Sequence, residues 1–132
     1  MKKLILITFA FLGLSASAQD TTDIYVINNT NRLVEITKMD ITSYSFFYRD
    51  LKYVKTIREL SFDNNEELEK FFDQAEKVLA TDVGVMTAKY NLSRNKLSKT
   101  TLKLRNKEDG YVMISRETLE IMRSEYQKSL NN

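Results

Sequence analysis

The strongest pattern of hydrophobic and polar positions lies between residues 68 and 79. Apolar residues recur there at offsets of three and four, which brings them to one face of a helix with 3.6 residues per turn. These residues are Leu68, Phe71, Phe72, Ala75, Val78 and Leu79. Asp63 with Glu66, or Asn64 with Glu67, has the spacing of an N-terminal capping pair. The pattern predicts a helix that begins near residue 64 or 65 and buries this face.

A second helical pattern ends the chain. Its apolar face consists of Leu119, Met122, Tyr126 and Leu130. Ser115 is the expected N-cap, because a serine side chain accepts a hydrogen bond from a backbone N–H of the first turn.

The residues before the first helix have the composition of strands. Residues 24–28 are rich in β-branched and aromatic types, and the Asn-Asn-Thr-Asn run at 28–31 signals a turn. Residues 33–41 continue the strand-like composition, and residues 51–62 fit a strand better than a helix. The polar residues 19–23 are expected to form a loose tail.

Tyr44, Phe46 and Tyr48 share one face if residues 43–48 are extended. Two interpretations remain open for them. They pack in the core, or they form an exposed aromatic recognition surface, which tyrosine suits because its ring is apolar and its hydroxyl is polar.

After Gly84 the period changes to two. Met86, Ala88, Tyr90 and Leu92 would share one face of a strand; Ser98, Thr100, Leu102 and Leu104 would share a face of the next. Asp109-Gly110 then marks a turn into a third strand, Tyr-Val-Met-Ile-Ser. The order of elements predicts an α+β fold, in which two amphipathic helices pack on one face of a largely antiparallel sheet.

The N-terminal segment has a different character. Lys2 and Lys3 precede an apolar run that ends at Leu14, and Ala16-Ser17-Ala18 follows as an A-x-A cleavage site. This order resembles the export signals of small exported proteins of Gram-negative bacteria, and the resemblance covers only residues 1–20. We therefore expect a cleaved signal peptide at 1–18, a single domain at 19–132, and a location in the periplasm or outside the cell.

Composition excludes several classes of chemistry. The chain has no histidine and no cysteine, so catalytic triads, Cys-His pairs and zinc sites built on imidazole or thiolate cannot form. With three glycines in all, it lacks the Gly-rich loops that bind nucleotides. We expect no metal and no cofactor.

Charge is unevenly distributed. Between Val83 and Lys107 no acid occurs, and the residues that strand alternation would place on the solvent face are Lys89, Lys99, Lys103 and Arg105. They form either a ligand-binding surface or a solvated face that keeps a sheet edge from pairing with other chains.

Two functions follow. The first is a non-enzymatic binding module of the cell envelope, whose partner is an envelope protein, an anionic glycan or a lipid headgroup. The second is a small hydrolase or lyase that uses carboxylates and tyrosines. Nucleic acid is not expected as a partner, because the chain is predicted to be exported and the formal charge of +2 is lost with Lys2 and Lys3.

The signal peptide gives the first testable prediction. The exported chain should begin at Gln19, because the A-x-A site ends at Ala18. Intact mass of the protein from a periplasmic fraction measures this directly. A chain in that fraction that retains residues 1–18 would contradict both the cleavage site and the inferred compartment.

Overall fold

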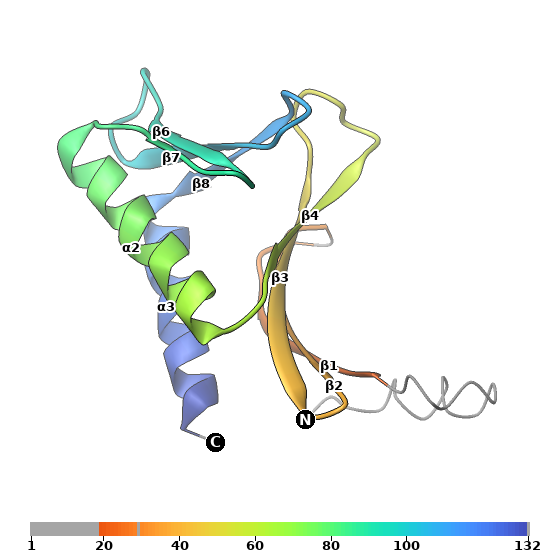
Figure 1. Ribbon diagram of the computed structural model, residues 1–132. Coiled ribbons are helices and arrows are strands. Elements are labelled where there is room, and N and C mark those ends of the chain that lie inside the picture. The colour runs from red at the N-terminus through yellow and green to blue at the C-terminus, as the bar shows by residue number, and fades with distance from the viewer. Residues whose placement is uncertain (1–18, 29, 132) are drawn as a thin grey trace.

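Each half of the part of the chain that the structure describes folds as a four-stranded antiparallel meander followed by one helix (Figure 1). The computed structural model describes residues 19–28 and 30–131, and the predicted signal peptide lies outside them. The first half contains β1 (Gln19–Val26), β2 (Arg32–Lys38), β3 (Ile41–Arg49), β4 (Ile57–Phe62) and α2 (Asn65–Thr81). The second half contains β5 (Val85–Met86), β6 (Asn91–Arg94), β7 (Thr101–Arg105), β8 (Tyr111–Ser115) and α3 (Arg116–Leu130).

The α+β class is confirmed, but the prediction of a single sheet is wrong. The strands form two separate sheets, β1 to β4 and β5 to β8, each in sequence order. The cause is the 17-residue helix α2, which carries the chain roughly 25 Å from the end of β4 at 1.5 Å per residue. β5 therefore starts a new sheet rather than extending the old one.

The helices join the two sheets through a shared core. α2 contacts α3 and strands of both sheets, and α3 contacts β1 and β8. All six residues of the predicted apolar stripe on α2 are buried. On α3, Leu119, Met122 and Tyr126 are buried as expected, whereas Leu130 is exposed. Neither helix among the described residues is long and apolar enough to span a membrane.

The predicted helix starts are confirmed. The Asn64 side chain caps α2 by accepting a hydrogen bond from the Glu67 N–H, and the Glu67 carboxylate accepts one from the Asp63 N–H. The Ser115 side chain caps α3 by accepting from the Thr118 N–H. Capping residues act within one turn, which is why the sequence alone located both starts.

Four strand predictions need correction. Ser98 and Thr100 lie in the turn before β7, which begins only at Thr101. Residues 19–23 are not a loose tail, because they pair with β2 as part of β1, and backbone pairing needs no apolar side chain. Residues 51–56 form a loop, and β4 begins only at Ile57. The expected strand through Met86 and Leu92 is broken by a turn, in which the Thr87 hydroxyl accepts hydrogen bonds from the N–H groups of Lys89 and Tyr90.

Asp50, at the end of β3, ties the two halves together. Its side chain is fully buried. Within the β3–β4 loop, its Oδ1 accepts from the N–H groups of Lys52 at 2.8 Å and Tyr53 at 3.1 Å. From the second half, the Tyr111 N–H donates to Oδ1 at 3.2 Å, and the Asn106 amide donates to Oδ2 at 3.3 Å.

Arg58 completes this buried site by donating from Nε to Asp50 Oδ2 at 3.0 Å. Burial alone would raise the pKa of Asp50, but the hydrogen bonds from Arg58, Tyr53, Lys52 and Asn106 outweigh it and hold the pKa well below its usual value. Gly110 lies so close that an added Cβ would come within 1.6 Å of Asp50 Oδ2. This contact requires glycine.

Asp50 should therefore control stability in a pH-dependent way. Its carboxylate has a lower pKa when folded, so the stabilisation is complete above the ordinary pKa of about 3.9 and is lost as pH falls toward the depressed value. We expect Asp50→Asn to lower the free energy of unfolding by about 3–5 kcal/mol at pH 7. The difference from wild type should narrow below about pH 4.

Urea titrations at pH 7, 4 and 3 measure this difference, with the exposed Asp63→Asn as control. The control should stay within about 0.5 kcal/mol of wild type at pH 7. A gap between wild type and Asp50→Asn that stays constant down to pH 3 would show that the charge of Asp50 is not responsible.

The aromatic centre of the core gives a second stability prediction. Phe71 is 2% exposed and its ring contacts those of Phe62, Phe72 and Tyr90. Phe71→Ala should cost about 3–5 kcal/mol because it leaves a cavity, whereas the exposed Lys70→Ala should cost less than about 0.5 kcal/mol. Equal effects in denaturant titration would contradict the placement of this helix face.

Candidate functional site

An open groove of about 960 Å³ lies along the outer face of the second sheet, the face opposite the buried side chains Leu102 and Leu104. Its lining comes from β5 to β8 and from the turn between β6 and β7. Its apolar and basic side chains include Met86, Lys96, Leu97, Lys103, Arg105 and Met113.

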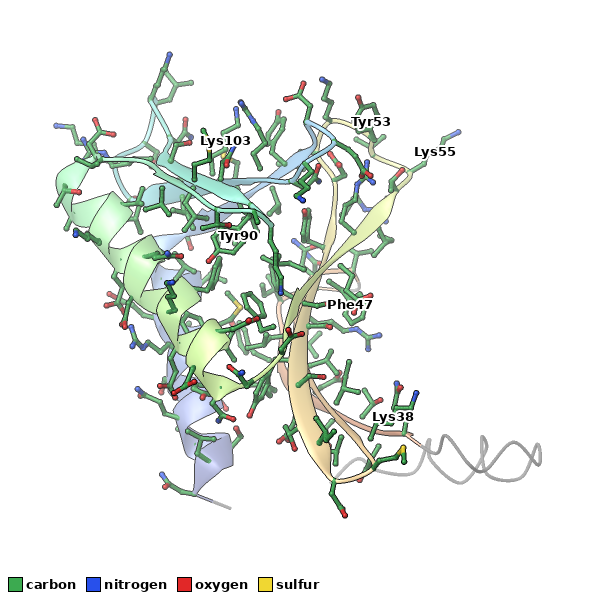
Figure 2. All side chains as sticks on the ribbon, viewed as in Figure 1. Lys38, Phe47, Tyr53, Lys55, Tyr90 and Lys103 are labelled. Atoms are coloured by element: carbon green, nitrogen blue, oxygen red, sulfur yellow. The ribbon has the colours of Figure 1, made fainter. Side chains whose placement is uncertain are left out.

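Two of the predicted basic residues stand together in this groove. Leu102 and Leu104 are buried, so the alternation of β7 turns Lys103 and Arg105 to the opposite face. Figure 2 shows Lys103 on this face. Lys103 Nζ lies 4.5 Å from the centre of the Tyr111 ring, a cation–π contact. None of the ion pairs among the described residues includes Lys103, although after Lys52 and Arg105 it also helps to lower the pKa of Asp109.

The same groove is also apolar. Met86 is 82% exposed and Leu97 is 96% exposed, while Met113 lies beside Lys103 in the register of β7 and β8. The one carboxylate in the lining is Asp82, and Arg94 lies 3.2 Å from it. Lys103, Arg105 and Lys96 therefore border exposed methionine and leucine side chains with no unpaired acid between them.

The other two basic candidates do not line this groove. Lys99 lies in the turn between β6 and β7. Lys89 lies in the turn between β5 and β6, where its Nζ donates to the Ser61 carbonyl at 3.0 Å and to the Glu67 carboxylate at 3.2 Å. Lys89 therefore links the second sheet to β4 and α2, and this is a structural role.

The aromatic candidates belong to the core. Tyr44, Phe46 and Tyr48 are each 2% exposed, and the Phe46 and Tyr48 rings stack at 5.5 Å. Burial raises the pKa of both tyrosines, and the Tyr48 hydroxyl accepts a hydrogen bond from Asn106. The exposed aromatic surface is not formed by these residues.

A smaller cleft of about 190 Å³ brings Glu67, Lys89 and Tyr90 together. The Tyr90 hydroxyl donates to Gln74 at 2.6 Å, and burial raises its pKa. The Asp63 N–H and then Lys89 lower the pKa of Glu67. The cleft thus holds one carboxylate, Glu67, which already accepts hydrogen bonds from Asp63 and Lys89. A carboxylate with a lowered pKa and occupied acceptor positions is poorly suited to acid–base catalysis.

A third pocket, between the two helices, contains Glu76 and Glu120. Both side chains are exposed, and Glu76 is paired with Arg123 at 2.9 Å. The described residues contain no group of three or more acidic side chains that could hold a metal ion.

Sequence reasoning missed the apolar part of the groove. Met86 and Leu97 were missed because an apolar residue in a strand-like run is normally assigned to the core. The position of Met113 on the outer face could have been predicted, because Met113 alternates with the buried Val112 and Ile114 in β8. Comparison of the chain with protein-family models, curated proteins and solved structures finds no match, so function is argued from this geometry.

Proposed function

We propose that the chain is a small, non-enzymatic binding module of the cell envelope. It binds an anionic component on the outer face of the second sheet. The observation that carries the proposal is the pairing of Lys103 and Arg105 with exposed Met86 and Leu97 around a groove of about 960 Å³.

The groove favours a ligand that is both anionic and partly apolar. A guanidinium and an ammonium on one strand, about 6.6 Å apart along it, suit carboxylate or phosphate oxygens. The methionines offer flexible apolar contacts that adapt to ligands of irregular shape. Arg105 Nε lies 3.8 Å from Asp109, an exposed pair that a stronger anion can displace at little cost.

Export is the second part of the proposal. Its support is the charged, apolar and small-residue order of residues 1–18. Every helix and strand that the structure describes follows the expected cleavage site, so removal of the signal would leave the described fold intact. The hydrolase or lyase alternative has less support, because the cleft at Glu67 holds a single carboxylate and the two carboxylates of the pocket between the helices are both exposed.

Charge reversal on β7 tests the proposal. We expect Lys103→Glu with Arg105→Glu to abolish capture of an anionic component from a detergent-solubilised envelope fraction, identified by mass spectrometry. The control is Lys70→Glu with Lys77→Glu on the exposed side of α2, which changes the net charge equally and should retain capture. Wild-type capture should weaken as salt shortens the Debye length to about 8 Å and below.

The proposal fails if the β7 variant, folded by circular dichroism, captures the same component as wild type at low and high salt.

A further inference from the structure

Two turns of the chain carry the same short pattern, an apolar residue between two lysines. The β3–β4 loop contains Lys52-Tyr53-Val54-Lys55, and the β6–β7 turn contains Lys96-Leu97-Ser98-Lys99. Both project from the end of the molecule that carries the outer face of the second sheet (Figure 1). Figure 2 shows Tyr53, Lys55 and Lys103 at this end.

The apolar residues of these turns are exposed. Leu97 is 96% exposed and Val54 is 55% exposed, with Leu51 at 44% and Tyr53 at 43%. Single exposed apolar residues are ordinary on protein surfaces. Here they gather at the tips of two projecting turns, and each tip is bordered by cations.

Hydrogen bonds hold both tips in shape. In the β3–β4 loop, the Arg49 guanidinium donates to the Val54 carbonyl at 2.6 Å, and the Thr56 N–H donates to the Tyr53 carbonyl at 2.8 Å. The buried Asp50 fixes the base of this loop from inside.

The β6–β7 turn is fixed in the same manner. The Asn95 side chain accepts from the Leu97 N–H at 3.2 Å, and the Asn95 N–H donates to the Thr101 carbonyl at 2.8 Å. The exposed side chains of both tips are therefore displayed on ordered turns, which reduces the entropy lost on binding.

The lysines leave this end of the molecule positive. Lys52 is paired with Asp109 at 2.6 Å. Lys55, Lys96 and Lys99 make no ion pair with any described residue. β7 runs from the turn that carries Lys96 and Lys99 toward Asp109, which pairs with both Arg105 and Lys52 of the β3–β4 loop. The cations therefore extend along β7 from one of these turns to the other.

We infer that this end of the molecule docks on an anionic lipid bilayer, with the two tips entering the headgroup region. This inference rests on the proposed function, from which it takes the negative charge of the partner. It adds that the partner is a lipid surface. Tyrosine favours the membrane interface, and lysine favours anionic headgroups. A hydrated anionic glycan would form ion pairs with the lysines but would provide no apolar contact for Leu97 or Val54.

The chain has no tryptophan, which permits a direct test with residues 19–132. Leu97→Trp places a single indole at one tip, and Ile41→Trp places one at the opposite end of the molecule, where Ile41 is 69% exposed. With vesicles of phosphatidylglycerol and phosphatidylcholine, we expect a blue-shifted emission for Leu97→Trp and none for Ile41→Trp. Pure phosphatidylcholine vesicles should shift neither.

Co-sedimentation with the same vesicles gives a second readout. Tyr53→Ser with Leu97→Ser should weaken binding at least tenfold, while the control Met39→Ser with Ile41→Ser should bind like wild type. Equal binding to neutral and anionic vesicles, or unchanged binding of the tip variant, overturns the inference.

A third outcome separates the two proposals. The protein would then bind vesicles of neither composition but would capture a soluble anionic component, and this capture would depend on Lys103 and Arg105. In that case the lipid inference fails and the proposed function stands.

Discussion

The structure depends on one buried carboxylate. Asp50 receives hydrogen bonds from its own loop, from Arg58 and from the β7–β8 region. A charge without these donors would be costly to bury, and the donors without the charge would be left unsatisfied. Asp50 therefore fixes where the first sheet meets the second.

This junction also sets the geometry of the candidate site. The Leu51 N–H donates to the Tyr111 carbonyl at 2.8 Å, so the loop that follows Asp50 runs beside the edge strand β8. Two ion pairs add to this junction: Arg58 pairs with Glu108, and Lys52 pairs with Asp109. The exposed Tyr53 and the cations of β7 thus lie at the same end of the molecule, although they come from different halves of the chain.

Local rules of the sequence predicted the helices well and the sheets only in part. The faces and caps of α2 and α3 depend on residues three or four positions apart, so they can be read directly. Which strands share a sheet depends on where the chain lies after α2. The alternation of apolar and polar residues within a strand does not contain this information. Asp50 was missed for the same reason, since an aspartate at the end of a strand is also typical of an ordinary turn.

The candidate site shows the same limit. Alternation placed Lys103 and Arg105 correctly because both lie within β7. It failed for Lys89 and Lys99 because they lie in turns, where the period of two no longer holds. The uneven charge of the second half was visible in the sequence, but its exposed apolar partners Met86 and Leu97 needed the structure.

The repeated order of four strands and a helix has a consequence for how the chain acquires its fold. Within each sheet, the strands pair in sequence order, so each meander forms through short-range contacts, which favour rapid folding. The bonds from Asn106 and Tyr111 to Asp50 instead span 56 and 61 residues. This topology predicts that each half organises first and that the junction closes last. Until then the apolar stripe of α2 lacks its partners on the second sheet, which makes the incompletely synthesised chain the state most prone to aggregation.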